Sequence, residues 1–191
     1  VPLRIAAPEI APGVVTAPVS TIDICPTLCN LAGISMAEVM PWTHGESLVP
    51  LSSGGSRRQA VAMEYAAEAS YAPLVSLCSG WWKYIRCALD PGQLFNLETD
   101  PHELCNLASN PQYAKILQDL RDQSHALWDL DRFDAEIRES QARRWVIYEA
   151  LCEGGYYPWD YQPLQKASER YMRNHMDLNA LEAKKRVPKR T

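Results

Sequence analysis

The sequence predicts an α/β fold class in the form of an α+β fragment: the end of an α/β core, a small antiparallel sheet covered by a helix, and an extended C-terminal tail. Three features predict this arrangement. Strand-like segments follow one another within residues 60–97, an apolar stripe with helical spacing spans 113–127, and an aromatic segment broken by prolines follows residue 155. Alternation with a period of two is typical of strands. Apolar residues at i, i+3, i+4 and i+7 are typical of a helix face that packs on a sheet.

The first elements precede the sheet. A short strand is expected at residues 2–7 and an extended piece at 14–19. A helix should then begin after Asp23, a favourable N-cap residue, with Pro26 in its first turn and Gly33 at its C-terminal stop. The apolar residues of this helix share one face: Ile24, Leu28 and Leu31.

The sheet should follow a loop-rich stretch at residues 34–58, which prolines and glycines interrupt. The expected strands lie, in order, at 60–65, 73–78, 81–87 and 93–97. Ser79-Gly80 separates the second strand from the third and indicates a hairpin.

Helices dominate the rest. Asn110 should cap a helix that starts at Pro111. Its apolar stripe consists of Tyr113, Ile116, Leu117, Leu120 and Leu127. A further helix is expected at 134–152 and a short one around 165–182. The sequence therefore predicts that the whole chain divides into three parts. They are 1–58 as the end of the α/β domain, 59–130 as the small-sheet subdomain with its covering helix, and 131–191 as a helix and an aromatic tail.

Composition bounds the function. Hydrophobic residues make up 47% of the chain and charged residues 22%, as in globular proteins, and the net charge of −4 argues against a nucleic-acid partner. No stretch approaches the ~20 apolar residues that span a bilayer, so no membrane association is expected. The chain opens with Val1 rather than Met and reads like a strand in mid-protein, so we expect it to be part of a longer protein.

The chain has six cysteines: Cys25, Cys29, Cys78, Cys87, Cys105 and Cys152. They could form a disulfide framework, but in a chain of this length and apolar content free, buried thiols and a reducing, cytoplasmic location are expected. Cys25 and Cys29 have no second pair at zinc spacing, so we expect no metal site there.

Several motifs in order resemble the C-terminal part of sulfatases of the alkaline-phosphatase superfamily. They are Ser20 to Gly33, Gly45 to Leu48, and Leu94-Phe95-Asn96-Leu97 with the turn that runs on to Ala108. This resemblance covers about residues 1–130. Three further segments narrow this resemblance to the choline sulfatases: Met63-Glu64-Tyr65, Ser140 to Arg144 and the aromatic tail.

The resemblance implies what the intact protein does: it would hydrolyse choline sulfate to choline and sulfate, with a divalent metal (calcium or manganese) and a formylglycine as cofactors. The family's nucleophile lies in a Cys/Ser-x-Pro/Ala-x-Arg run. We expect no such run in this chain, and none of the six cysteines begins one. We therefore expect this chain to lack the nucleophile, the metal ligands and any catalytic residue, and to be inactive alone.

The ammonium group of choline has no N–H, so carboxylates and aromatic faces must bind it. Glu64 lies on an expected strand among small and apolar residues, where a carboxylate is costly unless it is paired or faces a cavity. The alternative is a strand-end glutamate in solvent or bonded to the backbone. The resemblance favours Glu64 as a choline contact, and Glu68 is the second choice because residues four apart on a strand share a face.

Asp177 is the candidate in the tail, where a carboxylate could enter the pocket of a neighbouring subunit. A helix-capping role, or a salt bridge with Arg173 at i and i+4, is the alternative. The tail contains many aromatic residues. They must pack on the rest of the chain or on a neighbouring subunit to offset the entropy lost when the tail becomes ordered. The resemblance implies a homo-oligomer held through this tail. Aromatic residues could also stack on the cation, although at strand spacing they usually lie in a core: Trp81, Trp82, Tyr84 and Trp159.

Two other functions stay open from the sequence. One is a non-catalytic oligomerisation module, and the other is a module that binds a quaternary ammonium without cleaving it.

Overall fold

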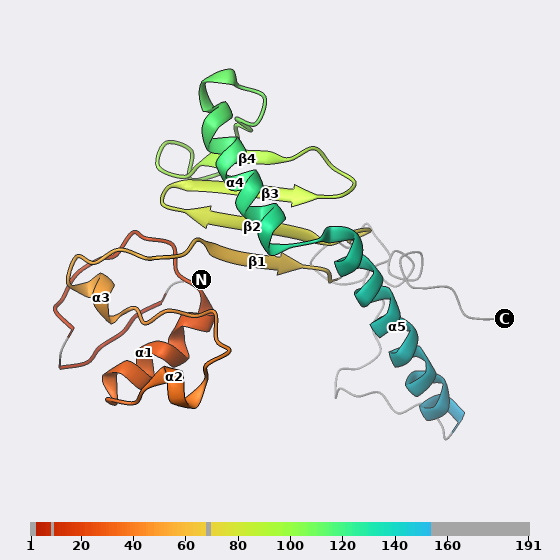
Figure 1. The fold of residues 1–191 in the computed structure, drawn as a ribbon, viewed down its shortest axis with the longest axis horizontal. Coiled ribbons are helices and arrows are strands. Elements are labelled where there is room, and N and C mark those ends of the chain that lie inside the picture. Colours follow the sequence, from red (N-terminus) through yellow and green to blue (C-terminus); the bar gives the residue numbers. More distant parts are fainter. Residues whose placement is uncertain (1–2, 9, 68–69, 154–191) are drawn as a thin grey trace, which may run out of the picture. The chain divides into compact units, whose positions relative to one another are not determined.

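The computed structural model describes residues 3–8, 10–67 and 70–153. Their elements are α1 (Ile24–Leu31), α2 (Met36–Val39), α3 (Val49–Ser52), β1 (Val61–Tyr65), β2 (Leu74–Ser79), β3 (Trp82–Cys87), β4 (Gln93–Asn96), α4 (Ala114–Leu127) and α5 (Leu130–Glu153) (Figure 1). Single 3-10 turns precede two of the helices: Thr21–Asp23 before α1 and Pro111–Tyr113 before α4.

The chain divides into two compact units. The described residues of Val1–Met63, Ser76–Ile85 and Gln93–Leu120 form the first unit, and those of Glu64–Val75, Arg86–Gly92 and Arg121–Thr191 form the second. The three-part division at residues 58 and 130 stays a prediction.

The strands form one four-stranded sheet in the order β1-β2-β3-β4. β3 and β4 are antiparallel, with Trp82 opposite Asn96 and Tyr84 opposite Leu94. Gly80, at φ 54°, makes the turn between β2 and β3, a conformation that favours glycine. The expected sheet and hairpin are therefore confirmed. The core residues of the sheet are almost inaccessible to solvent: Val75, Leu77, Tyr84, Leu94 and Phe95.

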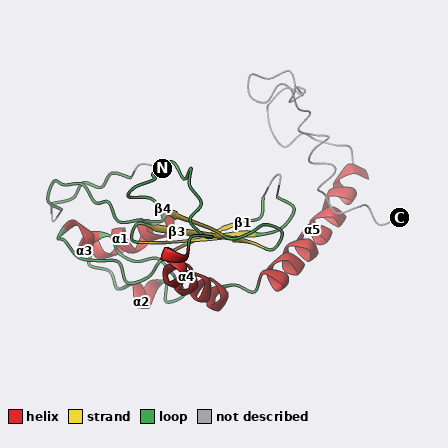
Figure 2. Ribbon diagram, turned by 90° about the horizontal axis from the view of Figure 1, so that it is seen from above, coloured by secondary structure: helices red, strands yellow, loops and turns green. Residues whose placement is uncertain are grey.

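The helix that follows the sheet starts as expected. The Asn110 side chain accepts a hydrogen bond from the backbone N–H of Gln112 at 3.0 Å, directly after which α4 begins. In the first unit the start of α4 lies against one face of the strands, where the rings of Tyr113 and Trp82 have centroids 5.2 Å apart (Figure 2). Leu120 is buried, but Leu127 is 59% exposed. Leu127 is wrongly included in the packed stripe, because it is the last residue of α4, where the chain turns towards α5.

The strand expected at 2–7 does not form within residues 3–8, and residues 14–19 have no regular structure. Strands need a partner for their N–H and C=O groups. The backbone here makes only a local bond between described residues, from Ile10 N–H to the Ala7 carbonyl. α1 is confirmed, with Gly33 at φ 68° after its end. Its expected apolar face is solvent-exposed, since Leu28 is 60% exposed.

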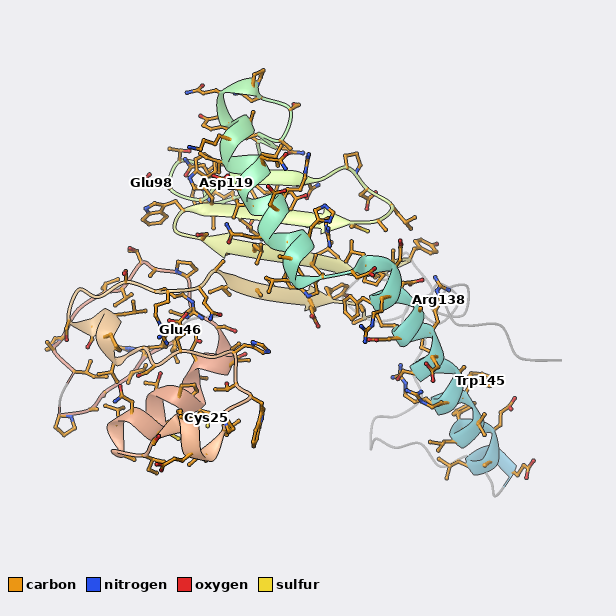
Figure 3. The ribbon with its side chains drawn as sticks, in the orientation of Figure 1. Cys25, Glu46, Glu98, Asp119, Arg138 and Trp145 are labelled. Carbon is orange, nitrogen blue, oxygen red and sulfur yellow. The ribbon has the colours of Figure 1, made fainter. Side chains whose placement is uncertain are left out.

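Asp23 plays a different part from that expected. Its side chain does not cap α1. The carboxylate is fully buried in the first unit and accepts hydrogen bonds from the Ser20 and Glu46 amides at 2.7 and 2.8 Å. Arg57 adds two more, at 2.6 and 3.0 Å. Asp23 thus ties the loop that contains Glu46 (Figure 3) to the start of α1.

α5 begins four residues earlier than expected. Asp129 Oδ1 accepts hydrogen bonds from the backbone N–H groups of Asp131 and Arg132, so that it caps the helix. Three ion pairs at i and i+4 run along the exposed surface of this helix: Arg132–Glu136, Arg138–Asp134 and Arg143–Glu139. The short helix expected at 165–182 lies outside the described residues. In the part of the chain that the structure describes, no helix is both long enough and apolar enough to cross a membrane.

Candidate functional site

Glu64 lies near the end of β1, and its side chain is exposed. Its Oε1 accepts a hydrogen bond of 2.6 Å from the indole Nε1–H of Trp128. Of the alternatives open from the sequence, the structure places this carboxylate in solvent, and its partner is an indole rather than the backbone. A role in contacting choline stays a prediction.

Trp128 occupies the junction between α4 and α5, and its backbone is bonded at both ends. Its N–H donates to the Ser124 carbonyl at 3.0 Å. Its carbonyl accepts from Nη2 of Arg86 at 2.8 Å, and Nη1 of the same arginine is bonded to Nδ1 of His125. Arg86 comes from β3 and is only 9% exposed. The junction is therefore anchored to the sheet by a buried cation.

An open cavity of about 510 Å³ adjoins this junction in the second unit. It is lined by Arg86, Cys87, Ala88, His125, Trp128, Asp129, Leu130 and Asp131. Its volume falls within the ~300–1,000 Å³ of small-molecule sites. An indole and two carboxylates are groups suited to a quaternary ammonium, because they offer a π face and negative charge without demanding an N–H. Glu64 adds a third carboxylate that shares Trp128 with the cavity.

Of the other candidate substrate contacts, some lie within the described residues and some outside them. Glu68, Asp177 and Trp159 lie outside the described residues. Tyr84 is buried in the sheet, and Trp82 is half-buried against Tyr113. Tyr84 is a core residue, as the spacing indicated, and Trp82 packs against the start of the covering helix. Trp81, on the turn after β2, is 41% exposed.

The sequence singles out neither Trp128, which is bonded to Glu64, nor Arg86, which is bonded to Trp128. Trp128 stands alone between two helices, without the neighbours that would mark a motif. Arg86 gives a usable signal: it shares strand parity with Tyr84 at an inward-facing position. A charged residue at such a position needs a dedicated partner.

The metal that the resemblance implies finds no fit in the described residues. Among them no group of three or more His, Cys, Asp or Glu side chains could hold an ion. The five cysteines whose side chains are described are free, as expected, but none is buried: Cys25, Cys29, Cys78, Cys87 and Cys105. Partial burial raises the pKa of the Cys78 thiol. The cytoplasmic location stays a prediction.

One run does carry the spacing of the sulfatase nucleophile, contrary to the expectation that no such run occurs in this chain. It is the serine form, Ser140-Gln141-Ala142-Arg143-Arg144. The structure places it in the middle of α5, where Arg143 pairs with Glu139 and Arg144 Nε donates to the Ser140 carbonyl at 3.4 Å. These arginines therefore serve the helix surface.

Comparison with known proteins agrees with the motifs. The family model of the N-sulphoglucosamine sulphohydrolase C-terminal region matches residues 1–129, and that of the choline sulfatase enzyme C terminal matches residues 135–187. Choline-sulfatase of Rhizobium meliloti (strain 1021) is 62% identical over 192 residues, which cover 99% of this chain and 38% of the relative. Arylsulfatase K of Danio rerio is 38% identical over 130 residues, which cover 63% of this chain and 24% of the relative.

Solved structures show a partial likeness. A solved 2-O GAG sulfatase matches with a TM-score of 0.46 and 32% identity, over 55% of this chain and 23% of that one. This chain spans well under half the length of these relatives. It belongs to the sulfatase family, by its match to the N-sulphoglucosamine sulphohydrolase C-terminal region, and its sequence is similar to the C-terminal region of choline-sulfatase.

Proposed function

We propose that this chain is the C-terminal region of a choline sulfatase, a sulfuric ester hydrolase that converts choline sulfate and water into choline and sulfate. Identity of 62% to choline-sulfatase over nearly the whole chain supports this. One structural observation supports a part in recognition: the exposed Glu64 carboxylate is held at 2.6 Å by the Trp128 indole.

Glu64 would contact the trimethylammonium end of the substrate. This cation cannot donate a hydrogen bond, so its binding depends on a negative charge at van der Waals distance and on aromatic surface. Glu64 supplies the charge. The positive charge of the ammonium does not change as the sulfate ester is cleaved. The contact therefore stabilises substrate and transition state alike, and its loss should raise KM more than it lowers kcat.

The remaining parts of the proposal concern residues beyond the described structure. Asp177 would enter the pocket of a neighbouring subunit, with Glu68 as a further candidate contact, and the tail would hold the homo-oligomer. The match of residues 135–187 to the choline sulfatase C terminal supports this assignment. The metal and the formylglycine would come from the part of the longer protein that this chain does not contain, so the chain alone would be inactive.

The test compares two substrates in the full-length enzyme. Glu64→Ala should lower kcat/KM for choline sulfate by about tenfold or more, because each 1.4 kcal/mol of lost binding corresponds to a factor of ten. The same variant should leave kcat/KM unchanged for an aryl sulfate, whose aryl group carries no positive charge. Glu98→Ala is the matched control, since Glu98 is an exposed glutamate of the first unit (Figure 3). Equal losses on both substrates would contradict the proposal.

A further inference from the structure

We propose that Trp128 is a positioning residue for Glu64, and that Arg86 in turn positions Trp128. This inference rests on the proposed role of Glu64 and deepens it, because it names the residues that would give that carboxylate a fixed direction. All three residues belong to the second unit, and each link between them is a hydrogen bond, of 2.6 Å from Trp128 to Glu64 and of 2.8 Å from Arg86 to Trp128.

The first link fixes the carboxylate. An exposed glutamate on a strand ordinarily samples many rotamers, and ordering it costs entropy. The indole has a single N–H in the plane of a rigid ring, so it offers one donor in one direction. A bond of 2.6 Å to an ionised carboxylate is short and charge-assisted. Trp128 therefore selects one orientation of Glu64 before any ligand arrives.

The same geometry leaves half of the carboxylate available. The bond engages Oε1, and no described residue donates to Oε2. A quaternary ammonium needs charge rather than a lone pair, so the indole bond and a cation contact are compatible on one carboxylate. Trp128 thus orients Glu64 without neutralising it.

The second link fixes the backbone from which the indole projects. The Trp128 carbonyl is held by Nη2 of Arg86, while Nη1 is bonded to His125 one helical turn earlier. A buried guanidinium is costly unless it is paired. Among the described residues no carboxylate lies within ion-pair distance of Arg86, and its hydrogen-bond partners there are one carbonyl and one imidazole. The fork of the guanidinium spans both groups at once, which a lysine cannot do.

The test uses the full-length enzyme and Trp128→Phe, which keeps an aromatic ring but removes the N–H. KM for choline sulfate should rise about three- to tenfold, as expected for the loss of a hydrogen bond to a charged group. The kcat, and the kinetics with an uncharged aryl sulfate, should not change. Trp42→Phe, at an indole of the first unit that is 70% exposed, is the matched control and should alter neither substrate.

A double-mutant cycle separates positioning from general damage. In a Glu64→Ala background, Trp128→Phe should add nothing to the loss on choline sulfate, since there is no carboxylate left to orient. Arg86→Lys should reproduce the Trp128→Phe phenotype in weaker form. Additive effects, or equal losses on both substrates, would overturn the inference. If Glu64→Ala is selective and Trp128→Phe is silent, only the positioning inference fails. If Glu64→Ala itself is not selective, the proposed function and this inference fail together.

Discussion

Arg57 donates two hydrogen bonds to the buried carboxylate of Asp23, from Nη1 at 2.6 Å and from Nη2 at 3.0 Å. The two residues are 34 positions apart in the sequence. The pair joins the segment before β1 to the start of α1 within the first unit. Both side chains are almost fully removed from solvent.

Breaking this pair should be strongly destabilising. Asp23→Ala leaves the guanidinium buried without its carboxylate, and the free energy of unfolding should fall by about 3–5 kcal/mol. Urea denaturation of the full-length protein measures the loss. Arg58→Ala is the control, because the Arg58 side chain is 85% exposed and pairs with Glu46 at the surface; it should cost about 0–1 kcal/mol. Comparable losses from the two variants would mean that the pair is not a special anchor.

The same carboxylate should make stability depend on pH. Burial raises the pKa of Asp23, but the bonds from Arg57 and from the Glu46 and Ser20 amides outweigh it, so that the pKa lies below its ordinary value. A carboxyl with a lowered pKa in the folded state stabilises the protein fully above its unfolded pKa. That contribution is lost as pH falls through the ordinary carboxyl range towards the folded pKa. Urea midpoints between neutral and acidic pH should fall less steeply in Asp23→Asn than in the parent.

Gly45 should resist substitution for a steric reason. A Cβ at this position would lie 2.2 Å from the backbone oxygen of Ile22, which cannot move as a side chain could. Gly45→Ala should therefore destabilise the protein by about 1–3 kcal/mol, as overpacking does. Gly13→Ala serves as control because no atom lies within 4 Å of its added Cβ. A shift of Tm in the control as large as that in Gly45→Ala would refute the steric account.

Deleting residues 156–191 tests the proposed tail. In the full-length enzyme both the oligomer mass, measured by light scattering, and the turnover of choline sulfate should decrease. Deleting only 184–191, the basic end, should change neither. An unchanged mass and an unchanged rate after the longer deletion would mean that the tail neither holds the oligomer nor contributes to turnover.

Local patterns predicted the elements well. Alternation, Gly80 and the Asn110-Pro111 start each act within a few residues, and the sheet and α4 formed where these signals lie. The strand at 2–7 failed because strands depend on a partner that a local pattern does not supply. Asp23 looked like a helix cap because its true partner, Arg57, is 34 residues away.

At the candidate site too, local sequence patterns do not reveal contacts between residues that are far apart in the chain. The sequence singled out Glu64 from its environment and a family resemblance, but not Trp128, which is 64 residues further along the chain. Only the fold brings the end of β1 to the α4–α5 junction. Arg86 was visible in principle as a charge at an inward position, although its partners were not.

We propose above all that Glu64 recognises the positive charge of the substrate. The most direct test of this role is the ratio of kcat/KM for choline sulfate to that for 3,3-dimethylbutyl sulfate, an isostere that lacks the ammonium charge, in the full-length enzyme. The ratio should be well above one in the parent and should fall by about tenfold or more in Glu64→Gln, which keeps shape but removes the charge. A ratio that is the same in the parent and in Glu64→Gln would contradict the claim.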